Sequence, residues 1–205
     1  MSFATLNEMN KTFKKILNNA SELFAEKGYE GTIMDELCIR SGVNKASIYY
    51  HFKDKSNLYE VVLTKLFSEV ADQIIVAVSS QTAPLEKLKS FIETFAQETY
   101  QNKQMPATLM REIASGGKNM PIPARKQMQR ILQTLSSILK EGAEQQVFKQ
   151  VDPLTTHFII IGSLCFFSTS EPMRQAIESE HPLDPDLNST IAEIYSLISS
   201  AIILN

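Results

Sequence analysis

The sequence predicts an all-α protein of about nine helices. Along most of its 205 residues, apolar side chains recur at steps of three and four positions, which places them on one face of an α-helix. Stretches that alternate apolar and polar residues between turn dipeptides, as the strands of a hairpin would, are nearly absent. Hydrophobic residues make up 43% of the chain, which is enough for a sizeable core and too much for a disordered segment.

The first two helices are expected to end at glycines. An apolar stripe runs from Phe13 to Phe24, and Gly28 follows at a position where helices often end in a left-handed residue. Thr32 is expected to cap the second helix with its hydroxyl, and that helix stops at Gly42. The chain therefore begins with one helix of moderate length and one short helix.

The third and fourth helices each follow a capping residue. Asn44 can cap a helix that extends only to about Phe52, and Asp54 can cap the next one. The fourth helix carries apolar residues as far as Ile74 and is about 25 residues long. A very short helix is thus expected directly before a long one.

Five more helices are expected after the segment SSQTAP. The breaks between them are the loop SGGKNMPIP, the pair Asp152-Pro153, which places a cap before a proline at the first helical position, and the segment SEHPLDPDLN. The expected helices cover about residues 85–102, 106–115 and 123–145, then a helix from 152 through the apolar run at 158–167, and a last helix at 189–204.

We expect two domains. Residues 1–54 hold the three short N-terminal helices, and residues 55–205 hold the longer ones. The helix from about 54 to 78 links the two parts, because it starts at the end of the first and supplies apolar residues to the second.

Charge, cysteines and apolar runs indicate a soluble cytoplasmic protein. The net charge of -3 does not by itself suggest a nucleic-acid partner, so the distribution of charge has to decide. Cys38 and Cys165 lie far apart, without CxxC spacing or a neighbouring histidine, and are expected to be free thiols rather than metal ligands. The first residues do not form a signal peptide, and the run FIIIGSLCFF is about half as long as a membrane span. We expect neither a membrane nor a cofactor.

The second and third helices, joined by SGVN, match a helix-turn-helix pattern. In that motif a tight, glycine-containing turn separates two helices, and the second of them enters the major groove of DNA. Between Asn44 and Leu58 the only acidic residue is Asp54, so this segment is locally basic within an acidic chain. Phe52 is expected to be a core residue that holds the short helix in place.

Around this motif, several side chains can reach phosphates or base edges. Lysines neutralise phosphate charge, and hydroxyl and imidazole groups donate hydrogen bonds to phosphate oxygens. The residues expected to contact DNA on this ground are Lys45, Ser47, Tyr49, Tyr50, His51, Lys53 and Lys55. Thr32 leaves the backbone N–H groups of a helix N-terminus free to meet a phosphate.

The segment FAEKGYEGTIMDELCIRSGVNKASIYYHFKDKSNL, from Phe24 to Leu58, resembles the DNA-binding signature of the TetR family of transcriptional regulators. It covers about a sixth of the chain. It departs from the family pattern in the second helix, where Thr32-Ile33 and Leu37-Cys38 stand in place of two threonines and Ile-Ala. The matching positions are Gly28, Tyr29, Thr32, Gly42, Val43, Lys45, Tyr49, Tyr50, Phe52, Lys55 and Leu58.

The resemblance implies a homodimer that places two recognition helices in successive major grooves of a palindromic operator. By position, Thr32 and Tyr50 would contact phosphate, and His51 and Lys55 would grip the backbone. The residues that would face the groove are Lys45, Ala46, Ser47 and Tyr49. A ligand pocket in the C-terminal part that controls DNA binding, and repression as the direction of control, are also implied.

The C-terminal helices are expected to form the dimer interface. The apolar run at 158–167 has almost no polar face, so a second surface must cover it, either within the chain or from a second copy. Small residues there and in the last helix permit the close approach of a four-helix bundle. The expected interface residues are Phe158, Ile161, Gly162, Cys165, Ile194, Tyr195, Ile198 and Ile202.

A largely hydrophobic effector is expected to bind between the two functional parts. Flexible methionines and aromatic residues on the intervening helices suit an adaptable apolar pocket, although core packing explains each one equally well. The expected pocket residues are Phe91, Phe95, Tyr100, Met105, Met110, Met120, Met128, Phe148 and His157. For His157 a core position is an alternative, and His181 is expected in a solvated loop.

Two other functions remain open at this level. An all-helical enzyme or small-molecule carrier could resemble a DNA reader at its N-terminus, but phosphate-cradling loops and nucleophile elbows are absent from the sequence. A regulator that acts mainly through a protein partner is the other alternative. Clustering of Lys45, Lys53, Lys55 and His51 favours DNA.

Overall fold

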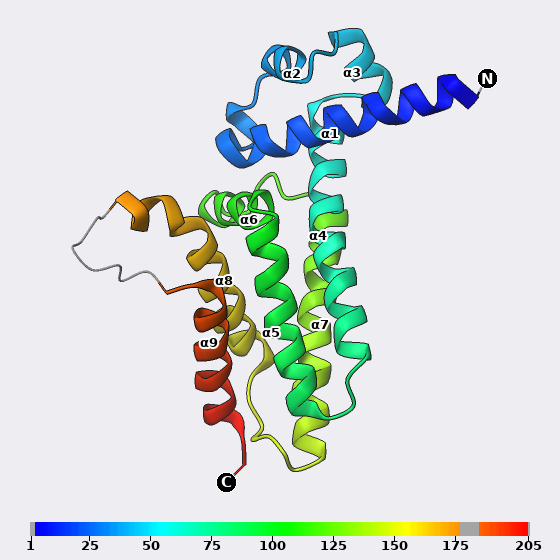
Figure 1. The fold of residues 1–205 in the computed structure, drawn as a ribbon. Coiled ribbons are helices and arrows are strands. Elements are labelled where there is room, and N and C mark those ends of the chain that lie inside the picture. The colour runs from blue at the N-terminus through cyan, green and yellow to red at the C-terminus, as the bar shows by residue number, and fades with distance from the viewer. Residues whose placement is uncertain (1–2, 177–184, 205) are drawn as a thin grey trace.

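The computed structural model describes residues 3–176 and 185–204, with side chains described from residue 11 (Figure 1). Within these ranges all regular elements are α-helices, apart from one isolated bridge between Phe148 and Ile203. The all-α prediction is therefore confirmed. The nine helices are α1 (Phe3–Gly31), α2 (Met34–Ser41), α3 (Lys45–His51), α4 (Lys55–Ser79), α5 (Pro84–Gln101), α6 (Gln104–Ala114), α7 (Ile122–Glu144), α8 (Pro153–Ala176) and α9 (Leu187–Ile202).

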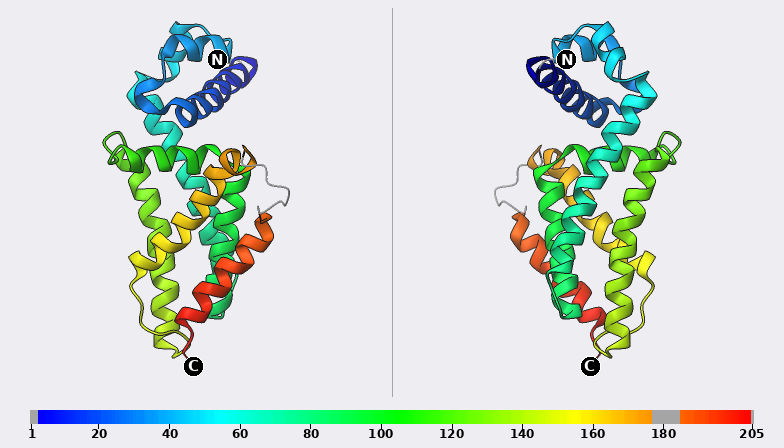
Figure 2. Two further views of the ribbon diagram at one scale, coloured as in Figure 1. Left: turned by 90° about the vertical axis from the view of Figure 1, so that its left-hand side faces the viewer. Right: turned by 90° about the vertical axis from the view of Figure 1, so that its right-hand side faces the viewer.

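The helices form a small N-terminal layer on top of a longer bundle. Helices α1, α2 and α3 lie together at one end, and α4 runs from that layer down the whole length of the bundle (Figures 1 and 2). Helices α5 and α7 pack beside α4, while α6 lies directly under α1. Helices α8 and α9 cover one side of the bundle, and the C-terminus lies at the end opposite to α1–α3.

The core of the bundle lies between α4, α5 and α7. Its central side chains are almost inaccessible, with Phe67 and Phe95 each 1% exposed and Leu135 fully buried. Burying an aromatic or leucine side chain of this kind contributes about 1.5–3 kcal/mol to folding. The apolar stripes of the sequence therefore face one another in this core, as their periodicity predicts.

Three of the predicted caps are present as hydrogen bonds. The Asn44 side chain accepts from the Ser47 backbone N–H at 2.8 Å, and the Asp54 carboxylate accepts from the Asn57 N–H at 2.7 Å. Asp152 accepts from the Thr155 N–H at 2.6 Å and begins α8. These bonds satisfy backbone donors that have no partner inside the helix, so they place the starts of α3, α4 and α8.

The predicted cap at Thr32 is wrong. Residue Ile33 occupies the N-cap position of α2 and makes no side-chain cap bond. The Thr32 hydroxyl instead donates to the Gly28 carbonyl oxygen at 2.8 Å, and its side chain is only 2% exposed. Gly28 does have a positive φ of 71°, but its ψ of 179° is extended rather than left-handed helical, and a further helical turn continues to Gly31. Thr32 therefore closes the end of α1 rather than opening α2.

Helix α8 is longer than the apolar run that it contains. It has 24 residues, and by length and composition alone it could cross a membrane. That criterion is weak, because the core helix of a soluble protein also meets it, and 39% of the most apolar 18-residue window is buried inside the fold. The predicted break at SEHPLDPDLN, including His181, lies mostly outside the described residues.

Gly142 has a packing role that a stability measurement can test. It lies in α7 directly under the Phe148 ring, and a Cβ at this position would overlap that ring. We expect Gly142→Ala to lower the free energy of unfolding by about 1–2 kcal/mol, because overpacking outweighs the higher helix propensity of alanine. Urea denaturation measures the change.

A matched substitution on the same helix is Gln133→Ala, at an exposed position. It should change the free energy of unfolding by less than about 0.5 kcal/mol. Equal stabilities of the Gly142→Ala variant and the wild type would contradict the assigned packing.

Candidate nucleic-acid interface

The turn between α2 and α3 depends on Gly42. Its φ of 56° and ψ of 33° are left-handed helical, and its N–H donates back to carbonyl oxygens at the end of α2. The Val43 N–H also donates to the Cys38 carbonyl oxygen at 3.2 Å. A residue with a Cβ is strained in this conformation, so glycine permits the tight change of direction from α2 to α3.

Helix α3 is held on α1 by its apolar side. Ile48 is fully buried and Phe52 is 1% exposed, which confirms the prediction that Phe52 is a core residue. The Phe52 ring stacks on Phe13 of α1 with 5.1 Å between centroids, and the His51 ring meets Phe13 edge-on at 5.9 Å. Because α3 has only seven residues, this packing rather than its own hydrogen bonds must stabilise it.

The opposite side of α3 is open to solvent. Tyr50 is 67% exposed and Tyr49 is 43% exposed, while Lys45 and Ala46 are exposed in the first turn. Tyr49 and Tyr50 follow Lys45 and Ala46 by one helical turn, so these four side chains lie on one side of α3. Lys53 is exposed just past the helix, after the extended residue Phe52. Ser47 lies half-buried beside them. We call the side chains of Lys45, Ala46, Tyr49, Tyr50 and Lys53 the α3 face.

The lysines around α3 differ in what they contact. Lys45 is paired with Asp35 of α2 at 2.6 Å, and its pKa is raised mainly by this hydrogen bond. Lys53 has no ion-pair partner among the described residues. The Lys55 ammonium lies over the Tyr29 ring, 4.6 Å from its centroid, and 3.4 Å from the Glu30 carbonyl oxygen. Lys53 is thus available to an incoming phosphate without breaking an ion pair.

The Thr32 hydroxyl is not available as a phosphate donor. The Thr32 side chain is 2% exposed, and its hydroxyl hydrogen is engaged with carbonyl oxygens of α1. The phosphate contact predicted at Thr32 therefore depends on backbone N–H groups at the start of α2 and stays a prediction. A buried threonine at the end of α1 and an exposed threonine at the start of α2 have the same sequence signal, because both precede an apolar stripe.

Two exposed apolar side chains of α2 were not predicted as part of this surface. Ile33 is 61% exposed and Ile39 is 82% exposed, whereas Met34 and Leu37 supply the buried side of α2. The signal was present in the periodicity, since Ile33 and Ile39 fall off the stripe formed by Met34, Leu37 and Ser41. Both side chains are therefore open to solvent outside the buried stripe of α2.

A buried polar contact connects the N-terminal layer to the bundle. The Tyr59 hydroxyl of α4 donates to the Glu112 carboxylate of α6 at 2.6 Å, and Glu112 is 3% exposed. Burial and this bond raise the pKa of Tyr59. The Arg111 guanidinium donates to the carbonyl oxygens of Ala25 and Glu26 at 2.7 and 2.5 Å. Helix α6 is therefore bound to the end of α1 and to the first turns of α4.

The predicted effector residues do not gather around one of the described cavities. Phe91, Phe95, Met105, Met120 and Phe148 are at most 8% exposed, and Met110 and Met128 are half-buried. Tyr100, 41% exposed, lines a cavity of about 230 Å³ with Phe167 and Leu187, whereas Phe148 borders a different one of about 760 Å³ near the C-terminus. Most of this set packs in the core instead, as the sequence already allowed.

The predicted dimer residues fall into three groups by exposure. Ile161, Cys165, Ile198 and Ile202 are 1–8% exposed within the single chain, so these four offer little surface to a partner. Ile194 and Tyr195 are half-buried. Phe158 is 63% exposed and Gly162 is also exposed, and they share their side of α8 with Ile159 and Phe166. Leu197 of α9 is 63% exposed as well.

Metal chemistry finds no support in the described residues. No group of three or more histidine, cysteine, aspartate or glutamate side chains lies close enough together there to hold an ion. Cys38 and Cys165 are free thiols, as expected, and burial raises the pKa of Cys165 to about 12.

Two family models match the chain. The model described as "Bacterial regulatory proteins, tetR family" matches residues 16–62, and the model described as "Tetracyclin repressor-like, C-terminal domain" matches residues 84–196. The first covers the second half of α1, all of α2 and α3 and the start of α4, and the second runs from the start of α5 into α9. Together they include both parts of the fold.

Among curated proteins, the chain is similar to the "Biofilm operon icaADBC HTH-type negative transcriptional regulator IcaR" of Staphylococcus aureus (strain Newman). The two are 35% identical over 81 residues, which is 40% of this chain and 44% of that regulator. The similarity thus spans less than half the length of the curated relative.

Solved structures show the same fold over nearly the whole chain. A mutant of HlyIIR is 23% identical, with a TM-score of 0.73 over 96% of this chain and 98% of that chain. The regulator FadR from Bacillus subtilis, in complex with stearoyl-CoA, is 18% identical, with a TM-score of 0.72 over 92% of this chain and 98% of that one. At these identities the likeness is one of fold.

The position of His157 leads to a prediction of how the free energy of unfolding depends on pH. It lies in the second turn of α8 with its Nδ1 atom buried and without a hydrogen-bond partner, and burial lowers its pKa. The folded chain therefore favours the neutral ring, whereas the unfolded chain takes up a proton near pH 6.5. The stability that this difference contributes is present above that pH and is lost as the pH falls below it.

We expect His157→Phe to make the free energy of unfolding fall less steeply than in the wild type between about pH 7 and 5. Urea titrations at several pH values measure the slope. Ser163→Ala, at an exposed position of the same helix, should keep the wild-type slope. Parallel pH profiles for wild type and His157→Phe would contradict the assignment.

Proposed function

We propose that this chain, which belongs to the TetR family of bacterial regulatory proteins, is a transcriptional regulator that binds DNA through α3. The observation that carries the proposal is the division of α3 into two sides. Ile48 and Phe52 hold one side on α1, and the α3 face remains open. The two exposed tyrosines and the flanking lysines of this seven-residue helix add little to folding stability, which favours a role in binding.

On DNA, the α3 face enters the major groove. Lys53 neutralises a phosphate directly, whereas Lys45 exchanges the Asp35 carboxylate for a phosphate or a base edge. Tyr49, Ala46 and Ser47 lie nearest the bases, and the Tyr50 hydroxyl and His51 reach the backbone. Lys55, which rests on Tyr29, contributes charge at the rim of this surface.

The active form is a homodimer on a palindromic operator. One helix-turn-helix reads a single half-site, and two must be held about 34 Å apart to read both. The exposed side of α8, with Phe158, Ile159 and Phe166, and Leu197 of α9 supply the apolar surface for this contact. These residues replace the buried ones predicted from sequence as the centre of the interface.

In this proposal a small, largely hydrophobic effector controls DNA binding, and the effector and the DNA bind to different units of the chain. Residues 1–54 form the DNA-binding unit, residues 55–205 form the effector and dimer unit, and α4 belongs to both. An effector that favours one orientation of α4 shifts DNA affinity by its differential affinity for the two states. Repression is the proposed direction, because the name of the relative IcaR describes a negative regulator. The cytoplasm is the proposed location.

DNA binding is tested by the salt dependence of affinity. Fluorescence anisotropy with DNA from upstream of the protein's own coding sequence measures the affinity. We expect specific binding whose affinity falls as the salt concentration rises. Lys53→Ala should reduce the slope of log K against log salt by about 2, because each of the two protomers on the operator loses one phosphate contact. The matched control is Lys140→Ala near the far end of α7, which should keep the slope. Absence of specific binding by the wild type would overturn the proposal.

The dimer surface is tested by mass in solution. We expect Phe158→Glu with Phe166→Glu to convert dimers to monomers in sedimentation experiments, since charges would be buried against apolar side chains. Ile113→Glu, on α6 and also well exposed in the wild type, is the control that should remain dimeric. A double variant that stays dimeric would place the interface elsewhere.

A further inference from the structure

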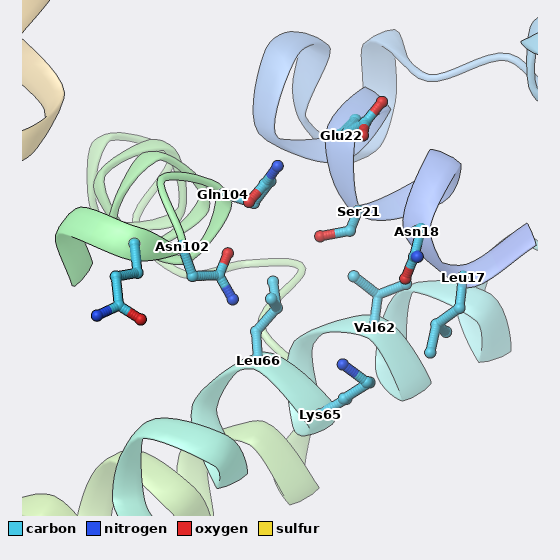
Figure 3. Close-up of a pocket in the computed structure, with 10 residues that line it drawn as sticks. Leu17, Asn18, Ser21, Glu22, Val62, Lys65, Leu66, Asn102 and Gln104 are labelled. Atoms are coloured by element: carbon cyan, nitrogen blue, oxygen red, sulfur yellow. The ribbon is translucent and has the colours of Figure 1, made fainter. Parts of the chain in front are cut away.

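A cleft opens where the N-terminal layer meets the bundle. Its volume is about 370 Å³, within the range of small-molecule sites in proteins. Helix α1 forms one wall, α4 forms the floor, and the corner between α5 and α6 forms the opposite wall (Figure 3). The lining residues are Leu17, Asn18, Ser21, Glu22, Val62, Lys65, Leu66, Gln101, Asn102 and Gln104.

The cleft combines a buried apolar floor with a polar rim. Leu17, Val62 and Leu66 are 1–5% exposed and present only small apolar areas to the cleft. Four carboxamides and one hydroxyl surround them, and Ser21 and Asn102 face each other from opposite walls (Figure 3). This is a different lining from the aromatic and methionine residues of the core.

The polar side chains of the rim have no protein partners. Among the described residues, none of Asn18, Ser21, Gln101, Asn102 and Gln104 makes a side-chain hydrogen bond or an ion pair. Each carboxamide can donate two hydrogen bonds and accept others. Four carboxamides and one hydroxyl around one small volume offer directional contacts to a ligand that carries several donors and acceptors.

The charges of the cleft do not favour an ionic ligand. It holds one cation, Lys65, and one anion, Glu22, so the two formal charges cancel. Lys65 is also paired with Glu69 at 2.7 Å, one turn farther along α4. A phosphate or an acyl carboxylate would meet Glu22 without gaining a free cation, whereas a neutral ligand loses nothing there.

We propose that this cleft binds a neutral, polyhydroxylated small molecule the size of a mono- or disaccharide. Hydroxyl groups both donate and accept hydrogen bonds and so match carboxamides, and the C–H faces of such a ligand pack on Leu17, Val62 and Leu66. None of the residues that line this cleft belongs to the set predicted from the sequence to bind the hydrophobic effector. The regulatory role of the cleft rests on the proposed DNA-binding function, whereas ligand binding by the cleft does not.

The ligand would act on the orientation of the DNA-binding layer. Arg111 already fastens the end of α1 to α6 through the Ala25 and Glu26 carbonyl oxygens. One to two turns earlier, α1 passes the α5–α6 corner across the open cleft, where Asn18 and Ser21 have no partner on the other wall. A ligand that bridges these walls supplies the missing contact and selects one angle between α1 and the bundle. DNA affinity then depends on its concentration.

Direct binding is measured on the full chain without DNA. A panel of neutral mono- and disaccharides and polyols is screened by saturation-transfer NMR, and calorimetry gives Kd for each binder. Free amino acids and inorganic phosphate form the comparison arm. We expect at least one neutral member to bind, and Asn18→Ala with Gln104→Ala to weaken it about tenfold, as the loss of two hydrogen bonds predicts. Gln73→Ala, an exposed amide of α4 outside the cleft, should leave Kd unchanged.

Three results would overturn the proposal: no binding by any neutral member, binding by the charged arm alone, or binding unaffected by the double variant. Thermal unfolding of each variant checks that it folds. Anisotropy with operator DNA, with and without the bound sugar or polyol, then tests the regulatory role, and an unchanged DNA affinity would limit the cleft to binding alone. Since the NMR screen contains no DNA, its outcome is independent of the proposed DNA-binding function.

Discussion

The packing of α3 on α1 is the contact on which the candidate DNA-binding surface depends. A helix of seven residues cannot hold its shape in water through its own hydrogen bonds. Ile48 and Phe52 provide the missing stability by burial, and the Phe13 ring receives Phe52. The Asn44 and Asp54 caps set where the helix can start and where the next one begins. The exposed tyrosines therefore project from a fixed base rather than from a loop.

The same rigid layer is joined to the bundle by a few polar contacts and one long helix. Arg111 and Glu112, neighbours on α6, contact α1 and α4 respectively. The second carboxylate oxygen of Glu112 is buried without a protein partner, so this junction is polar but not completely satisfied. A junction with a cleft on one side and an incompletely bonded carboxylate within it can change its angle at a lower energetic cost than a close-packed core. This is the property that a ligand-controlled regulator needs.

Much of the fold and part of the site could be predicted from sequence. The helix boundaries were close because caps and apolar stripes are local signals, and Phe52 was recognised as an anchor for the same reason. Thr32 was misassigned because its hydroxyl had two carbonyl acceptors at the end of α1 that only the folded chain brings near. The burial of four dimer candidates within the single chain was also not visible in the sequence. Cys165 and Ile198 lie on helices that are apolar on most sides, and periodicity alone does not say which side meets the chain's own core.

The sequence by itself determined the helical class, the caps, the glycine turn and the local excess of lysine around α3, since each depends on residues a few positions apart. Only the tertiary structure decided which lysines remain unpaired, which side of α8 is exposed and where a cleft opens between α1 and the α5–α6 corner. Lys45 contacts Asp35, and Asn18 and Gln104 line the same cleft, because of the angles between helices. Those angles follow from the packing of many side chains at once, and no local pattern in the sequence records them.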